Sequence, residues 1–229
     1  MRRTVCIVLL VILFVGAGLL WLGPGGKATL FLNGLDWTTS ADSGIATPAP
    51  SSGDTLEAFG LSGPASCRAT EPPTNSPWLK VARADAEKYQ LDPMVFVWKI
   101  WQESGFRTDA VSSAGAVGIA QFMPSTAAGM GIDPHDPEQS LDASARLDAG
   151  HITQNADRAL QLAKHYGGSS ARYGYALALA AYNAGPGNLN SAWNQAFAKS
   201  WPASPWAWLT LMGLETQHYI PNIMNCSVK

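Results

Sequence analysis

Residues 93–105 of the chain read PMVFVWKIWQESG, and this stretch carries the clearest structural signal in the sequence. Asp92 and Pro93 form a helix start, because an aspartate at the N-cap accepts backbone N–H groups and proline fits the first helical position. Apolar residues dominate the stretch on all sides, which is typical of a buried helix. Gly105 is a natural C-cap. We therefore expect a buried helix that carries Glu103 in its last turn.

Further helix signals lie on both sides of this segment. Ser76 and Pro77 repeat the cap-and-proline start, and Ser125 opens a helix after Pro124. Apolar residues recur at helical spacing over residues 141–166, 172–184, 189–199 and 205–219. No run of alternating strand residues stands out, so we expect an all-α domain over residues 77–226.

Composition and charge exclude several classes of function. The 229 residues are 47% hydrophobic and carry a net charge of −2, with no basic block to bind nucleic acid. The histidines have neither the HExxH spacing nor paired cysteine ligands, so we expect no metal and no other cofactor. They are His135, His151, His165 and His218. A P-loop, a GxGxxG turn and a GxSxG elbow are also absent from the sequence.

Residues 1–23 are expected to form a membrane anchor. Two arginines precede an uncharged run over residues 4–22, which is close to the roughly 20 residues that a membrane-spanning helix needs. The arginines favour a cytoplasmic N-terminus. A cleaved signal peptide is the alternative, with Val15 and Ala17 as the small residues of the cleavage site. Either reading places the rest of the chain outside the cytoplasm, and the first makes it a single-pass protein of the cell membrane.

Residues 24–76 are expected to form a flexible linker. They are rich in Gly, Pro, Ser and Thr, in pieces such as TPAPSSGD and EPPTNSP, and such sequences bury too little apolar surface to fold. Residues 30–35 are more apolar. A short strand and a continuation of the membrane interface both remain open for them.

Two of the three cysteines flank the predicted domain. Cys67 precedes it and Cys226 ends it, whereas Cys6 lies in the apolar run, where it serves as a small hydrophobic residue. In an oxidising compartment an even pair indicates a disulfide, here between Cys67 and Cys226. Two unpaired thiols are the alternative.

Glu103 is the candidate for acid catalysis. The negative end of the helix dipole and apolar neighbours such as Phe96, Ile100 and Phe106 both disfavour its carboxylate, so they raise its pKa. A carboxylic acid that stays protonated near neutral pH can protonate a leaving oxygen. From these residues alone, an ordinary surface glutamate in a last helical turn remains open.

An ordered set of motifs resolves this choice. The motifs are ESGF at 103–106, AVSSAGAVGIAQ at 110–121, MPST at 123–126, AYNAG at 181–185 and ETQHY at 215–219. The set resembles the soluble lytic transglycosylase (SLT) family, whose catalytic domain is similar to goose-type lysozyme, over residues 77–224. The resemblance implies a lysozyme-like helical fold and an enzyme that cleaves glycan strands of peptidoglycan in the bacterial cell wall. The stretch 150–168 looks long for the family, and its role is unknown.

The resemblance also implies a role for each matching residue. Glu103 would be the catalytic acid and base. The substrate-binding residues would be Ser112, Gln121, Met123, Tyr182, Asn183 and Glu215. Among them, Ser112 and Gln121 would hydrogen-bond the sugar, and Tyr182 would approach the catalytic carboxylate. Glu215 would be a supporting acid in the groove.

The loop SSAGAVGIAQ at residues 112–121 has two features of its own. Gly115 and Gly118 would allow the backbone to approach a sugar closely or to adopt positive φ, and a plain tight turn is the alternative. Ile119 and Ala120 stand where the family usually has Leu and Met. This departure removes volume from a subsite but no catalytic group.

The expected mechanism uses a single carboxylate. Glycosidases with two need them about 5–5.5 Å or about 6.5–9.5 Å apart. Near Glu103 the sequence offers only Asp109, in a pattern more typical of a solvated loop residue or a helix cap. The resemblance implies that Glu103 protonates the oxygen between MurNAc and GlcNAc and that the MurNAc C6 hydroxyl closes a 1,6-anhydro ring. A hydrolytic muramidase and an inactive peptidoglycan-binding module of a secretion or conjugation apparatus are the alternatives.

Overall fold

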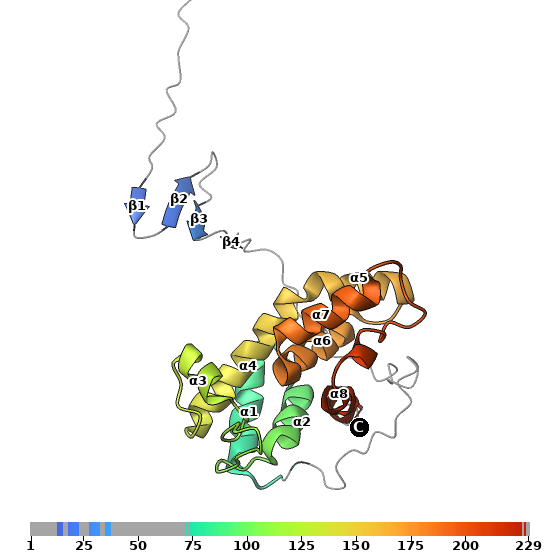
Figure 1. The fold of residues 1–229 in the computed structure, drawn as a ribbon. Helices are drawn as coiled ribbons and strands as arrows, with labels where there is room; N and C mark the ends of the chain where they lie inside the picture. Colours follow the sequence, from blue (N-terminus) through green and yellow to red (C-terminus); the bar gives the residue numbers. More distant parts are fainter. Residues whose placement is uncertain are drawn as a thin grey trace, which may run out of the picture. The chain divides into compact units, whose positions relative to one another are not determined.

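The structure, a computed structural model, describes residues 13–15, 18–22, 28–32, 35–37, 72, 74–225 and 227 (Figure 1). The chain divides into two compact units, Met1–Ile45 and Ala46–Lys229. Cys67, Cys226 and most of the predicted linker lie outside the described residues. The predicted disulfide therefore stays a prediction.

The first unit contains four short antiparallel strands in sequential order. They are β1 (Leu13–Val15), β2 (Gly18–Leu22), β3 (Ala28–Leu32) and β4 (Leu35–Trp37). The helix predicted over residues 4–22 is therefore wrong where the chain is described. A continuous apolar run has no period that separates a helix from a strand, and the glycines at 16 and 18 weaken a helix. Among the described residues, no helix combines the length and the apolar character that crossing a membrane requires.

The described part of the second unit is helical, which confirms an all-α domain there. Its helices are α1 (Pro77–Lys88), α2 (Pro93–Ser104), α3 (Pro124–Met130), α4 (Pro137–Gln154), α5 (Ala156–Tyr166), α6 (Ser170–Ala184), α7 (Pro186–Phe197), the 3-10 helix η2 (Leu209–Leu211) and α8 (Leu214–Met224). Two isolated β-bridges, both made by Val117, occur in the loop between α2 and α3.

The start and end of α2 follow the sequence signals. The Asp92 carboxylate accepts the N–H groups of Met94 and Val95 at 2.8 and 3.3 Å, and Gly105 ends the helix with φ 66°. Ser76 precedes α1 as its N-cap, but its side chain makes no capping hydrogen bond. The start of α1 therefore depends on Pro77 at the first helical position.

The helical pattern over residues 141–166 is divided into two helices. The break lies at Asn155, whose side-chain N–H donates to the carbonyl of His151 at 2.9 Å and whose side-chain oxygen accepts from Arg158 at 3.0 Å. Asparagine side chains compete with the backbone for hydrogen bonds in this way, which ends α4 before α5 begins.

The helix predicted over residues 205–219 is wrong in its bounds. The first part is turns and η2, and α8 begins only after Gly213 and continues past Pro221 to Met224. Proline inside a helix removes a backbone hydrogen bond. Here Ile220 and Ile223 on either side of it are fully buried, so packing overrides the local preference.

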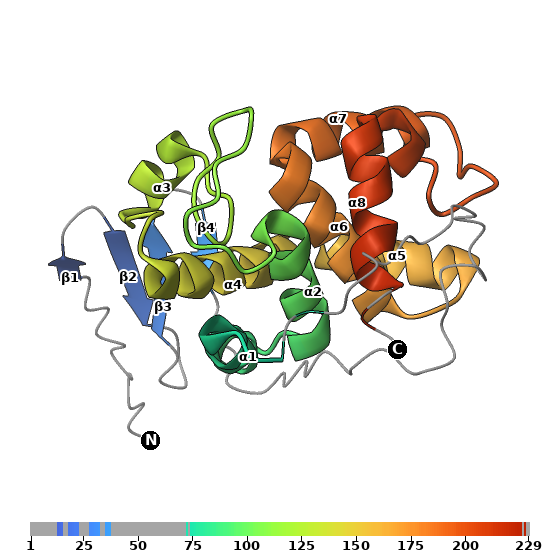
Figure 2. The same ribbon diagram turned by 90° about the horizontal axis from the view of Figure 1, so that it is seen from below.

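Helix α6 is the centre of the domain. It packs against α4, α5, α7 and α8, while α2 packs against α1 and α8 (Figure 2). Residues 171–181 of α6 are all buried, and the alanines and Gly174 among them leave room for the surrounding helices. This packing brings side chains from α2, α6 and α8 to one place beside the loop that follows α2.

Candidate active site

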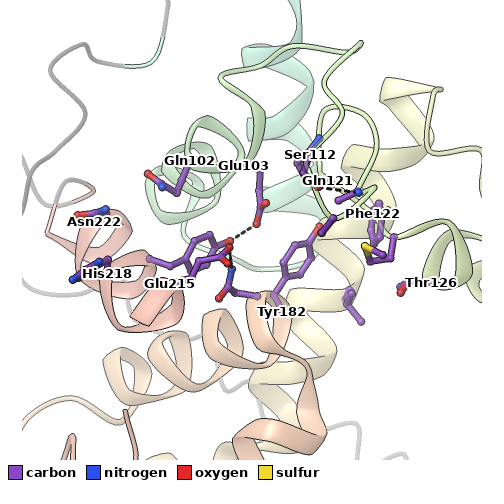
Figure 3. A pocket seen from close by; sticks show the side chains of 16 residues that line it. Gln102, Glu103, Ser112, Gln121, Phe122, Thr126, Tyr182, Glu215, His218 and Asn222 are labelled. Atoms are coloured by element: carbon purple, nitrogen blue, oxygen red, sulfur yellow. Dashed lines mark hydrogen bonds between the residues drawn. The ribbon is translucent and has the colours of Figure 1, made fainter. Parts of the chain in front are cut away.

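A cavity of about 540 Å³ lies where α2, α6 and α8 meet the loop between α2 and α3 (Figure 3). All seven residues selected from the sequence line it. They are Glu103, Ser112, Gln121, Met123, Tyr182, Asn183 and Glu215. The structure thus brings residues from all five motifs to one site, while their roles toward a substrate stay predictions.

Glu103 is half-buried in the last turn of α2 and lines the cavity. Burial raises its pKa from 4.5 to about 7, although a hydrogen bond from Tyr219 and the charge of Lys99 lower it. The apolar side chains expected to surround it on α2, Phe96 and Ile100, are fully buried. The direction of the pKa shift expected from the sequence is therefore confirmed, with desolvation as its main cause.

Tyr219 on α8 donates a hydrogen bond from its hydroxyl group to Oε1 of Glu103. Burial and the charge of Glu103 raise the pKa of Tyr219 well above its usual value, so the hydroxyl stays protonated. The family resemblance predicts that Tyr182 approaches the carboxylate. The charge of Glu103 contributes to the raised pKa of Tyr182, and the Tyr182 hydroxyl donates its hydrogen bond to the backbone carbonyl of Ala120 at 2.7 Å.

Three further cavity residues on α8 lie outside the set that the motifs assign to substrate binding. Besides Glu215, this helix contributes His218, Tyr219 and Asn222 to the lining. Their spacing of three and four residues puts them on one face of a helix. Extending that face from Glu215 would have found them without the structure.

Hydroxyl groups from two helices hold the loop that forms one wall of the cavity. Ser104, the last residue of α2, donates to the carbonyl of Ile119 at 2.7 Å. Tyr182 on α6 holds the next carbonyl, that of Ala120. Adjacent residues of the loop are therefore fixed from two separate elements.

Ser112 and Gln121 also bind the loop to itself. The Ser112 hydroxyl oxygen accepts the N–H of Ala116 at 3.0 Å. The Gln121 side-chain nitrogen donates to the carbonyls of Ala110 and Gly118 at 3.2 and 2.8 Å, and its backbone has a positive φ of 52°. Both residues face the cavity with side chains whose orientation is already set.

Glycine is favoured at the two loop positions for different structural reasons. Gly118 has φ +79°, and a Cβ there would lie 2.0 Å from the carbonyl oxygen of Pro134. The close approach that glycine allows here is therefore between the Gly118 backbone and Pro134. Gly115 has φ +86° with no atom within 4 Å of an added Cβ, so only its backbone conformation favours glycine.

Asn183 connects α6 to α8 beside the cavity. Its amide nitrogen donates to Glu215 at 3.2 Å, and its amide oxygen accepts the Thr216 hydroxyl at 2.6 Å. The first bond holds the side chain of Glu215 on the cavity wall, and the second holds Asn183 itself.

Asp109, the other carboxylate near Glu103 in sequence, does not line the cavity. Its side chain is 84% exposed and pairs with Arg107 at 3.5 Å. It is the solvated loop residue that the sequence favoured. Among the described residues, no group of three or more His, Cys, Asp or Glu side chains is arranged to hold a metal ion.

Comparisons with known proteins show which family the chain resembles. The family model described as "Transglycosylase SLT domain" matches residues 80–202, more than half of the chain. A "Transglycosylase" of Enterobacteria phage PRD1 is 29% identical over 94 residues, which are 41% of this chain and 36% of the phage protein. The matched segment thus spans little more than a third of that relative.

Among solved structures, an inactive mutant of the lytic transglycosylase Slt from Pseudomonas aeruginosa matches with a TM-score of 0.45 and 23% identity. The match covers 65% of this chain and 23% of the Slt chain. The family match over residues 80–202 includes Glu103, the loop and the Tyr182–Asn183 motif. The resemblance inferred from the motifs is therefore confirmed, and the chain belongs to the transglycosylase SLT domain family.

Proposed function

We propose that the protein is a lytic transglycosylase that cleaves the β-1,4 bond between MurNAc and GlcNAc in peptidoglycan and leaves 1,6-anhydro-MurNAc ends. One observation carries the proposal. Glu103 lines a cavity of about 540 Å³, and its pKa is about 7, so acid and base forms are both available near neutral pH. Membership of the SLT family and the name of the phage relative support the same activity.

The proposed reaction uses Glu103 twice. Its carboxylic acid gives a proton to the glycosidic oxygen, the bond from that oxygen to C1 of MurNAc breaks, and the bonding electrons leave with GlcNAc. The C6 hydroxyl of the same MurNAc then bonds to C1, and its proton returns to the Glu103 carboxylate. One C–O bond replaces another, so no water is consumed.

Tyr219 fits this cycle because its hydroxyl is aimed at the group that changes charge. A hydrogen bond to a carboxylate is stronger than one to a neutral acid. Tyr219 therefore stabilises the intermediate stage, in which Glu103 is ionised, more than the starting stage.

A hydrolytic muramidase is the second candidate, and the position of Glu215 favours it. Glu215 lines the same cavity as Glu103 and interacts with it electrostatically. A second carboxylate on the cavity wall could activate a water molecule. However, Glu215 is held by Asn183, which suits a supporting residue as well as a base.

The proposed substrate sets the proposed location. Peptidoglycan strands lie outside the cytoplasm, so we propose that the helical domain acts there, with glycan strands as its binding partner. Transport of the domain out of the cytoplasm can be followed with a C-terminal reporter enzyme that is active only in an oxidising compartment.

Mass spectrometry of digested cell walls tests the function. Purified peptidoglycan treated with the protein should release muropeptides with anhydro ends, lighter by one water than hydrolytic products. Glu103→Gln should release none, while Glu87→Gln, which changes an exposed glutamate on α1, should act like the unaltered protein. Reducing ends alone would establish the muramidase, and binding without cleavage would establish a glycan-binding module.

A further inference from the structure

Lys99 is a charged residue inside the apolar helix α2, and its side chain is completely buried. Its ammonium nitrogen lies 2.8 and 2.7 Å from the two carboxylate oxygens of Asp148 on α4, and 2.8 Å from the hydroxyl oxygen of Ser144. These contacts provide one acceptor for each of its three N–H groups. Neither Lys99 nor Asp148 lines the cavity.

The pair lies directly beside the cavity residue Tyr182. Lys99 Nζ is 3.2 Å from the centre of the Tyr182 ring, within the range of a cation–π contact. The Ser144 hydroxyl donates to the Tyr182 hydroxyl at 3.2 Å, and Tyr182 in turn donates to Ala120 in the loop. A continuous series of contacts therefore leads from the ion pair to the cavity wall.

Lys99 also lies one helical turn before Glu103 on α2. Residues four apart share a face of a helix, with roughly 5–6 Å between their Cβ atoms. In the charge balance at Glu103, the effect of Lys99 exceeds the opposing effect of Asp148. The net effect of the pair is therefore that of a positive charge, which lowers the pKa of Glu103.

We propose that Lys99 and Asp148 are positioning residues for the reaction: Lys99 holds Tyr182 and its loop in place, and its charge stabilises the Glu103 carboxylate that remains after proton transfer. Asp148 supplies the counter-charge that keeps the lysine ionised in a dry site. The inference rests on the proposed function, because it assigns the pair a task at the catalytic acid.

Burial works against the charges of both partners, which is why a role in addition to packing is needed. Desolvation lowers the pKa of Lys99 and raises that of Asp148, and each partner opposes the shift of the other. Replacing such pairs by apolar residues of similar size is often neutral or stabilising. The stability of the folded protein therefore does not explain why these positions hold an ion pair and not apolar residues.

The remaining titratable groups around the pair do not take over its task. On α4, burial and Lys99 both lower the pKa of His151, so this residue stays neutral near pH 7. On α8, Tyr219 stabilises the Glu103 carboxylate, whereas Glu215 destabilises it. Besides Tyr219, Lys99 is the group that stabilises the ionised form.

Two double variants test the proposal. Lys99→Met with Asp148→Leu keeps the shapes but removes both charges, and Lys99→Gln with Asp148→Asn keeps a neutral hydrogen-bonded pair. In both, we expect the thermal stability to be retained or raised. The pKa of Glu103 should rise by about 0.5–1 unit, and kcat should fall about tenfold with little change in KM.

The exposed ion pair Lys88–Asp142 between α1 and α4 provides the matched control. Lys88→Met with Asp142→Asn removes charges that do not line the cavity and should leave the pH–rate profile unchanged. Asparagine at 142 keeps an acceptor for the Tyr89 hydroxyl, which binds Asp142 at 3.1 Å.

Two readouts separate this inference from the proposed function. The pH–rate profile of cell-wall cleavage follows the catalytic acid, and NMR titration of the 13C-labelled Glu103 carboxyl follows the same group without turnover. An unchanged Glu103 titration in a folded double variant would overturn the inference. Loss of stability together with an unchanged titration would show a purely structural pair. An inactive unaltered protein would instead reject the proposed function and leave the titration to decide on the pair.

Discussion

The hydroxyl group of Tyr219 on α8 and the carboxylate of Glu103 on α2 are joined by a hydrogen bond, although 116 positions separate them in the chain. The bond favours the ionised carboxylate, whereas burial of Glu103 favours the acid. The pKa of about 7 is the balance between these two effects. A substitution at Tyr219 changes the hydrogen bond without changing Glu103, and a substitution at Glu103 removes the titrating group itself.

Tyr219→Phe removes the hydrogen bond but keeps the ring. The pKa of Glu103 should rise by about 1–2 units, because a hydrogen bond to a charged group is worth roughly 1.5–3 kcal/mol. The alkaline limb of the pH–rate profile should therefore move to higher pH, and kcat should fall. Tyr166→Phe is the control, because this hydroxyl also donates one hydrogen bond, to Pro202 at 2.6 Å, but Tyr166 does not line the cavity. An equal shift in both variants would contradict the prediction.

Glu103→Gln should change how stability depends on pH. The pKa of Glu103 is about 7 in the folded protein, above its ordinary value of 4.5. Its favourable contribution is complete below about pH 4.5 and is lost as the pH rises through 7. The glutamine variant should therefore gain stability over the unaltered protein at pH 8, by about 3 kcal/mol at most, but not at pH 4. Thermal unfolding at both pH values measures the difference, with Glu87→Gln as the control.

The two loop glycines should respond differently to alanine. Gly118→Ala places a Cβ 2.0 Å from the carbonyl oxygen of Pro134, so the loop must move, and we expect a loss of about 2–4 kcal/mol. Gly115→Ala meets no atom within 4 Å and should cost only about 1–2 kcal/mol, for the positive φ. Denaturant unfolding distinguishes the two. Equal losses of stability would mean that the positive φ, and not the contact with Pro134, sets the cost of both substitutions.

The predicted bridge between Cys67 and Cys226 is tested by mass. Alkylation of the protein, expressed in an oxidising compartment, should label these two cysteines only after reduction. A loop closed over this length should contribute about 4–5 kcal/mol by restricting the unfolded chain, so reduction should lower the melting temperature. Labelling before reduction would show two free thiols.

Local signals explain what the sequence predicted well. Asp92, Pro93 and Gly105 set the ends of α2 through contacts with their immediate neighbours. The direction of the Glu103 pKa shift could be predicted because a carboxyl group on an apolar helix is expected to be desolvated, and burial is the main cause of the shift. The motif residues were found because their order along the chain is a property of the sequence itself.

Contacts between distant segments explain what could not be predicted. A lysine in the middle of an apolar helix gives no sign of its partner, and Asp148 is 49 positions away. The hydroxyl of Tyr182 on α6 donates to Ala120, whereas that of Tyr219 on α8 donates to Glu103, and these partners depend on how the helices pack. In the N-terminal run the described residues 13–15 and 18–22 are strands, which could not be predicted because a continuous apolar run has no period that separates a helix from a strand.

The paired anchoring of the loop has a consequence for how a glycan enters. Ser104 and Tyr182 hold the successive carbonyls of Ile119 and Ala120, so this wall has little conformational freedom left to lose on binding. Preorganisation of this kind lowers the entropic cost of association. It also means that no closing motion of this wall has to precede the chemistry. A glycan strand should therefore meet a cavity wall that already has its working shape. The rate of turnover should then depend on the proton transfers at Glu103.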